Sequence, residues 1–210
     1  MLPVSALFVS VVSLALAVIH GQAMERMAEA NARLVSANSW PLLQYTTGNI
    51  SDNGDLDISL RIQNQGVGPA KVEWLEVYWE GKPIRDDVEL LKICCGLDSD
   101  AFRKSQAVRG STVEEKIANA KAAAKSSIRS DLPGVGGRGV LQAKQQGSFL
   151  TLGFTPDTAS VWQRLNTARM KVRLRGCYCS VFDECWISDM RTLHPTPVKV
   201  CPAPRSPFRG

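Results

Sequence analysis

Histidine is scarce in this sequence, and this scarcity limits the chemistry that the chain can perform. The 210 residues contain only His20 and His194. A Ser-His-Asp or Cys-His catalytic system needs an imidazole base, and His20 lies at the edge of an apolar run, so such a system would have to use His194. A two-carboxylate hydrolase needs no histidine. The nearest carboxylates, which we otherwise interpret as turn and solvent-facing residues, are Asp55, Asp57, Asp183 and Glu184. We therefore expect no catalytic residue and no enzyme.

Two other signatures are missing. The chain has 25 Lys and Arg against 20 Asp and Glu, but its basic residues do not cluster with aromatic residues as they do in nucleic-acid-binding domains. The glycine-dense segment LPGVGGRGV (132–140) lacks the Gly-Lys-Ser/Thr end of a phosphate-binding loop, and we interpret it as a flexible loop. The sequence thus predicts no nucleic-acid partner and no cofactor.

Cysteine, by contrast, is present in an even number. The six residues are Cys94, Cys95, Cys177, Cys179, Cys185 and Cys201. An even count is typical of a disulfide framework, which persists only in oxidising compartments. Zinc sites usually use Cys-x2-Cys spacing, and redox centres favour Cys-x-x-Cys at a helix N-terminus. The chain offers only Cys-Cys and Cys-x-Cys, so we favour structural disulfides over a metal site or a reactive thiol.

The segment CYCSVFDECW predicts one of these bonds. If the two last strands pair around a turn at 180–184, Cys179 lies opposite Cys185, and Tyr178 lies opposite Trp186. Directly opposed residues have β-carbons about 4.5–5.5 Å apart, and a disulfide needs about 3.8 Å, so a modest adjustment joins Cys179 to Cys185. The partner of Cys177 remains open among Cys94, Cys95 and Cys201.

The N-terminus predicts a membrane anchor. Residues 2–19 carry no charge, and their length suits a bilayer-crossing helix, which needs roughly 17–25 apolar residues. The basic start of a signal peptide is missing, and the next residues are good helix formers. We predict a transmembrane signal-anchor at 1–20, with the lipid bilayer as its partner, and a helical stalk at 21–38. The alternatives are a signal cleaved after 15–17 or 21–23, and a buried helix of a soluble protein.

The remaining chain predicts a mainly β domain over 39–193. Residues 55–62 alternate apolar and polar positions, as a half-buried strand does. Residues 71–81 change phase at Trp74-Leu75, which indicates a bulge or a strand buried on both faces. Further alternation occurs in 148–154, where Leu150, Leu152 and Phe154 are in phase, and in 170–179. Short strands separated by Gly and Pro turns favour an antiparallel sandwich.

Helical patterns interrupt these strands. Residues 85–95 predict a short helical turn or an irregular strand. An excursion at about 97–131 contains a helix with a capping box, formed by Ser111 with Glu114 or by Thr112 with Glu115. Thr155 and Pro156 predict the N-cap and first residue of another helix. The last segment, 194–210, has five prolines and no periodicity, so we predict an extended tail.

Three segments carry a resemblance to known proteins: 64–70 (NQGVGPA), 139–141 (GVL) and 177–186. With the N-terminal run, the chain resembles a group of bacterial single-pass envelope proteins that carry an immunoglobulin-like β-sandwich outside the membrane. The resemblance implies an antiparallel immunoglobulin-like sandwich. It also implies a location in the inner (plasma) membrane, with the C-terminal domain in the periplasm or extracellular space. It implies no reaction.

Three functional hypotheses follow. The first is a non-enzymatic, membrane-tethered interaction or scaffold module that binds another envelope protein or the cell-wall polymer. The second is an envelope hydrolase that uses carboxylates or His194. The third is a metal or thiol sensor at Cys94-Cys95 and Cys177/Cys179. We favour the first, because the chain combines an anchor with a disulfide-rich β-domain and lacks a recognisable catalytic set.

Overall fold

The structure is a computed structural model that describes residues 2–98, 100, 112–126, 128–133 and 139–210. The chain divides into two compact units, Met1–Ser39 and Trp40–Gly210. The first is a single helix, α1 (Leu2–Asn38). Its segment Phe8–Asn38 is long and apolar enough to cross a membrane, so α1 suits a membrane anchor or a signal sequence. The helix ends before Trp40-Pro41, because a residue that precedes proline avoids the helical conformation.

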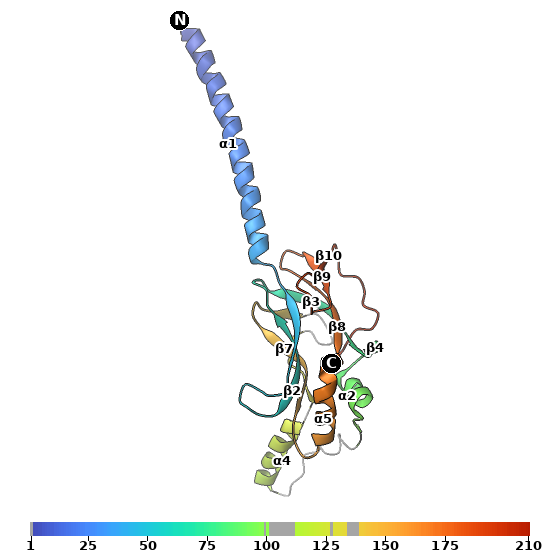
Figure 1. The fold of residues 1–210 in the computed structure, drawn as a ribbon. Helices are drawn as coiled ribbons and strands as arrows, with labels where there is room; N and C mark the ends of the chain where they lie inside the picture. Colours follow the sequence, from blue (N-terminus) through green and yellow to red (C-terminus); the bar gives the residue numbers. More distant parts are fainter. Residues whose placement is uncertain (1, 99, 101–111, 127, 134–138) are drawn as a thin grey trace. The chain divides into compact units, whose positions relative to one another are not determined.

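The second unit is built on two antiparallel sheets that pack together (Figure 1). The first sheet has the order β1-β2-β7-β5, with bounds Leu43–Gly48, Asp57–Asn64, Gln146–Gly153 and Ile128–Arg129. The second has the order β10-β9-β8-β3-β4, with bounds Thr196–Val198, Cys185–Ser188, Arg173–Cys179, Ala70–Trp79 and Lys82–Ile84. A short strand, β6 (Gly139–Leu141), also pairs with β3.

Helices lie beside these sheets, in the three segments whose patterns suggested them. Within the described residues they are α2 (Asp87–Cys95), α4 (Val113–Ser126), α5 (Ala159–Ala168) and a 3-10 turn at Arg169–Lys171. Leu90 and Leu91 of α2 and Leu165 of α5 are fully buried and belong to the same core as the strands. The protein is therefore mixed α/β and not mainly β as we predicted, because α2 and α5 share the core of the sheets.

The strand patterns hold in the centre of the sheets and change at two bulges. Ile58, Leu60 and Ile62 of β2 are fully buried, as their alternation predicts. The register of β3 against β8 shifts between Val72 and Trp74, so a bulge explains the change of phase. The register of β2 against β7 also shifts, which the sequence did not predict, and this second bulge leaves Phe149 as an extra residue between Ser148 and Leu150.

The second bulge alters the burial that we predicted for 148–154. Phe149 and Leu150 are both fully buried, although they are neighbours in a strand. Phe154, which we placed in phase with Leu150 and Leu152, is 41% exposed. Strand β7 ends at Gly153, so Phe154 no longer follows the alternation and instead stacks edge-on against Trp162 of α5, with ring centroids 5.4 Å apart.

Local hydrogen bonds explain where the helices begin. Asp86 caps α2 by accepting from the Glu89 amide at 2.7 Å, so the helical alternative for 85–95 is correct. The Thr112–Glu115 capping box forms at 3.2 and 3.3 Å, whereas Ser111 and most of 97–111 lie outside the described residues. Helix α5 begins at Ala159. The predicted N-cap at Thr155 is wrong, because Thr155 instead donates its amide to Thr158 Oγ1 within a turn.

The segment 64–70 is a loop organised by one buried side chain. Asn64 Oδ1 accepts from the amides of Leu42 and Gly66, and its Nδ2 donates to the carbonyls of Gly68 and Leu141. A β-carbon at Gly66 would lie 2.4 Å from the Trp40 carbonyl oxygen, so only glycine fits there. Asn64 therefore fastens the start of the domain to the β2–β3 loop.

Candidate functional site

The cysteine-rich hairpin has the register that we predicted. Strands β8 and β9 place Cys179 opposite Cys185 and Tyr178 opposite Trp186. Cys179 and Cys185 are joined by a disulfide, with Cα atoms 4.0 Å apart. On the other side of the hairpin, the rings of Tyr178 and Trp186 lie 6.0 Å apart. Cys177, whose partner the sequence leaves open, is bonded to Cys201 of the C-terminal tail.

The two disulfides lie side by side. The sulfur of Cys179 is 3.8 Å from that of Cys201, and the sulfurs of Cys179, Cys185 and Cys201 all lie within 4.8 Å of one another. A cysteine binds a metal as the thiolate, and all six cysteines, each within the described residues, are in disulfides. In this oxidised form the cluster is a covalent cross-link between the hairpin and the tail.

The third disulfide joins the neighbours Cys94 and Cys95 at the end of α2. Their Cα atoms are 3.7 Å apart, so the bond connects no separate segments. Cys95 is fully buried in the core, and Cys94 packs against the core from its edge. This pair therefore contributes little to the topology, in contrast to the cluster on the hairpin.

The tail is held by a buried carboxylate as well as by Cys201. Glu76 of β3 is 0% exposed. Its Oε1 accepts from the amides of Arg205 at 2.6 Å and Ser206 at 3.0 Å. Its Oε2 accepts from the Tyr78 hydroxyl at 2.8 Å and from the Arg175 guanidinium at 3.4 Å. Burial by itself raises the pKa of Glu76, but these donors outweigh it, and the pKa is lowered from its usual 4.5.

Further contacts make the tail part of the domain. The Trp74 indole donates to the Pro202 carbonyl at 2.7 Å. The Phe208 amide donates to the Leu75 carbonyl at 2.7 Å, and the Phe208 ring is buried edge-on against Phe149 at 5.6 Å. Residues 196–198 form strand β10. The prediction of an extended tail thus missed that this segment is a strand and a core element.

The carboxylates proposed for a hydrolase do not share a site. Asp57 is the first residue of β2 in the first sheet, and Asp55 lies two residues before it. Asp183 and Glu184 lie in the β8–β9 turn of the second sheet, where Asp183 is paired with Lys71. His194 is exposed in the tail before β10. The structure therefore brings together no pair of these residues beyond sequence neighbours.

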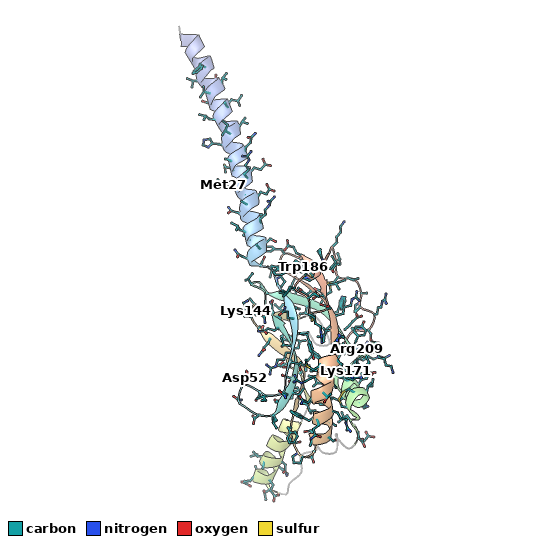
Figure 2. The ribbon with its side chains drawn as sticks, in the orientation of Figure 1. Met27, Asp52, Lys144, Lys171, Trp186 and Arg209 are labelled. Atoms are coloured by element: carbon teal, nitrogen blue, oxygen red, sulfur yellow. A yellow bond between two sulfur atoms is a disulfide. The ribbon has the colours of Figure 1, made fainter. Side chains whose placement is uncertain are left out.

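Asp57 belongs instead to a polar pocket of about 720 Å³ on the outer face of the first sheet. Strand β2 contributes Asp57, Ser59 and Arg61, which alternate with its core residues. Asp57 Oδ2 pairs with Arg129 of β5 at 3.0 Å. Other charge at the pocket comes from Asp131 and from Asp52, which Figure 2 labels in the loop before β2.

Two polar atoms of the pocket lack hydrogen-bond partners among the described residues. They are Asp57 Oδ1 and Ser59 Oγ, and Ser59 is only 3% exposed. Burial raises the pKa of Asp57, and the Arg129 guanidinium opposes this shift. A buried polar atom normally has a partner, so Asp57 Oδ1 and Ser59 Oγ are polar atoms that lie beneath the floor of the pocket and carry no hydrogen bond within this part of the chain.

Sequence reasoning missed this pocket because it treated Asp57, Ser59 and Arg61 as a solvent-facing row. The available signal was that three polar residues of both charges share one face of a single strand. What the sequence could not reveal is that the segment 128–131, far along the chain, lies beside β7 and forms the wall of the pocket.

Comparisons with known protein families, with curated proteins and with solved structures found no match to this chain.

Proposed function

We propose that this chain is a membrane-tethered interaction module of the cell envelope, non-enzymatic, with its β-domain on the outer side of the plasma membrane. The observation that carries the proposal is the combination of an exposed apolar helix with two disulfides that fasten the hairpin and tail of the following domain. Such bonds persist in the periplasm or extracellular space, not in the reducing cytoplasm.

We infer further that the domain is an immunoglobulin-like sandwich. Constant-type immunoglobulin domains have strands ABED in one sheet and CFG in the other. Taken in chain order as A, B, D and E, the strands β1, β2, β5 and β7 lie in the order A-B-E-D. Strands β9, β8 and β3 likewise take the order G-F-C, with β4 as an added edge. This agreement supports the inference; the described residues add to this scheme the strands β6 and β10 and the helices α2, α4 and α5.

The polar pocket is the best-supported binding surface of this module. Its lining offers hydroxyl, amide, carboxylate and guanidinium groups, which suit the hydroxyl and amide groups of a cell-wall polymer. Another envelope protein is the alternative partner. The hydrolase hypothesis is weaker because its carboxylates lie in different sheets, and the sensor hypothesis is weaker because the cysteines are paired.

Two experiments test the proposal. A reporter fused after Gly210 should be active only outside the cytoplasm, and a cytoplasmic C-terminus would refute the location.

The full chain in detergent should co-sediment with insoluble wall polymer, and Arg61→Ala should weaken this binding. Lys82→Ala, which removes an exposed charge from β4, is the matched control. If both variants are retained equally by the polymer, the pocket is not the binding surface. If the chain hydrolyses an ester or a glycan from a test panel, and His194→Ala abolishes that activity, the hydrolase hypothesis replaces the non-enzymatic one.

A further inference from the structure

The part of α1 that follows the apolar run exposes large apolar side chains. Met24, Met27 and Leu34 are 67%, 60% and 60% exposed, and Figure 2 shows Met27 among the side chains that project from this helix. If α1 crosses the membrane as proposed, residues 21–38 form a rod of roughly 27 Å in water. Apolar side chains that are uncovered along such a rod mark a surface for another helix.

The sequence of this rod separates its apolar and charged residues by face. Met24, Met27, Asn31 and Leu34 follow the 3-4-3 spacing of positions a and d in a heptad repeat. The charged residues all fall at positions b, c and f, away from that line: Glu25, Arg26, Glu29 and Arg33. Arg33 forms an ion pair with Glu29 of the same helix at 2.7 Å, so the charges of these two residues are paired on the side of the helix away from the a and d positions. The flanking e and g positions hold only Gly, Ala and Val.

The same line continues without a break into the apolar run. Going back from Met24 with the same spacing, it passes through His20, Ala17, Ser13 and Ser10. Larger side chains, such as Phe8, Leu14 and Ile19, fall at other positions. Helices in lipid associate through small and polar residues, whereas helices in water associate through larger apolar residues at a and d. The line therefore changes from small and polar residues to larger apolar residues where the helix would leave the bilayer.

We propose that α1 is a self-association element, in which two copies of this chain pair in parallel along the line from Ser10 to Leu34. A helix that pairs along this line must also cross the bilayer. Its contacting residues must change from small to large at the same depth relative to the membrane surface. A second, parallel copy meets both requirements. Parallel pairing also places Asn31 opposite its own counterpart, and an Asn at an a position favours a two-stranded, in-register arrangement. This proposal rests on the anchor of the proposed function.

Disulfide cross-linking in native membranes tests the pairing directly. We would place single cysteines in the full chain at Met24, Met27 and Leu34 on the line, and at Glu25, Glu29 and Ala32 away from it. After mild oxidation, the first three variants should give a disulfide-linked dimer on non-reducing gels, and the other three should give little. Equal cross-linking around the helix, or a product with a different protein at the line positions, would overturn the proposal.

A matched charge pair provides a second, independent test. Met27→Glu places two like charges in the seam and should weaken dimerisation of the full chain in detergent by roughly tenfold or more. Ala32→Glu adds the same charge on the outer side, where Ala32 is exposed, and should change it by less than about twofold. Equal effects would contradict the seam.

Failure of this inference can be told apart from failure of the anchor. A chain that keeps α1 by intact mass and sediments with membranes, yet stays monomeric, refutes the self-association alone. If the chain is released from membranes, and its intact mass shows that it has been cleaved within or just after residues 15–23, the anchor of the proposed function is refuted.

Discussion

Replacement of Glu76 tests whether one buried carboxylate holds the C-terminal tail on the second sheet. In Glu76→Ala, the amides of Arg205 and Ser206 and the Tyr78 hydroxyl lose their acceptor, and Arg175 loses its counter-charge. The Arg175 side chain is 42% exposed, so the loss of its counter-charge costs less than the roughly 3–5 kcal/mol of a fully buried pair, and most of the effect comes from the unpaired donors, at about 1–3 kcal/mol each. Since a displaced tail can rehydrate its amides, we expect a loss of about 3–5 kcal/mol in the free energy of unfolding.

The conservative variant separates the charge from the shape of this side chain. Glu76→Gln keeps an oxygen acceptor for the two tail amides, but it turns an NH2 donor toward Tyr78 and Arg175. Hydrogen bonds to a charged group are about twice as strong as neutral ones. We therefore expect a smaller loss of about 2 kcal/mol at neutral pH. This order, alanine worse than glutamine, follows from the four contacts and not from burial alone.

The lowered pKa of Glu76 makes its contribution depend on pH. A carboxyl group whose pKa is lower in the folded state binds protons more readily when unfolded, so its stabilisation is complete above the unfolded pKa, near 4.5. That stabilisation is lost as the pH falls through the lower pKa of the folded state. The gap in stability between wild type and Glu76→Gln should therefore be constant at neutral pH and should shrink below about pH 4.5.

Urea unfolding of the full chain in detergent, followed by tryptophan fluorescence, measures these differences. Trp74 is a useful reporter because its indole contacts the tail at Pro202. Alkylation before and after reduction should confirm that the disulfides stay intact in each variant. If both variants unfold within about 0.5 kcal/mol of wild type, or if the wild-type to glutamine gap does not change with pH, the carboxylate does not hold the tail.

Two further predictions concern the same tail. The double variant Cys177→Ala/Cys201→Ala opens a loop that spans 24 positions and should lower the free energy of unfolding by about 3.5 kcal/mol. Cys94→Ala/Cys95→Ala opens no loop between separate segments and should cost less than about 1 kcal/mol of loop entropy. Alanine adds no polar group at the buried Cys95 and Cys177, so equal losses in urea unfolding would contradict this account. Phe208→Ala removes a buried ring from beside Phe149 and should cost about 3–5 kcal/mol. Arg209→Ala, which changes an exposed side chain, should stay within about 0.5 kcal/mol, and thermal unfolding that ranks the two variants equally would place Phe208 outside the core.

The features that were predictable depend on neighbours in sequence. Alternation with period two identified the core residues of β2, and the spacing around the 180–184 turn fixed the β8–β9 register. The Thr112–Glu115 capping box needs only residues three apart. The wrong helix start at Thr155 shows the limit of such reasoning, because Thr158 Oγ1 binds back to the Gly153 carbonyl of β7 at 2.8 Å and holds 155–158 as a turn.

The sequence by itself determined an apolar helix, the alternating strands and a hairpin with opposed cysteines, because each depends on side chains a few positions apart. Only the tertiary structure decided that Cys177 bonds to Cys201, that Phe208 enters the core beside Phe149, and that Arg129 pairs with Asp57 in the wall of a polar pocket. Each of these contacts joins segments more than 20 residues apart. The packing of both sheets and the tail against one another decides which distant segments come into contact. The local periodicity of the sequence does not predict these contacts.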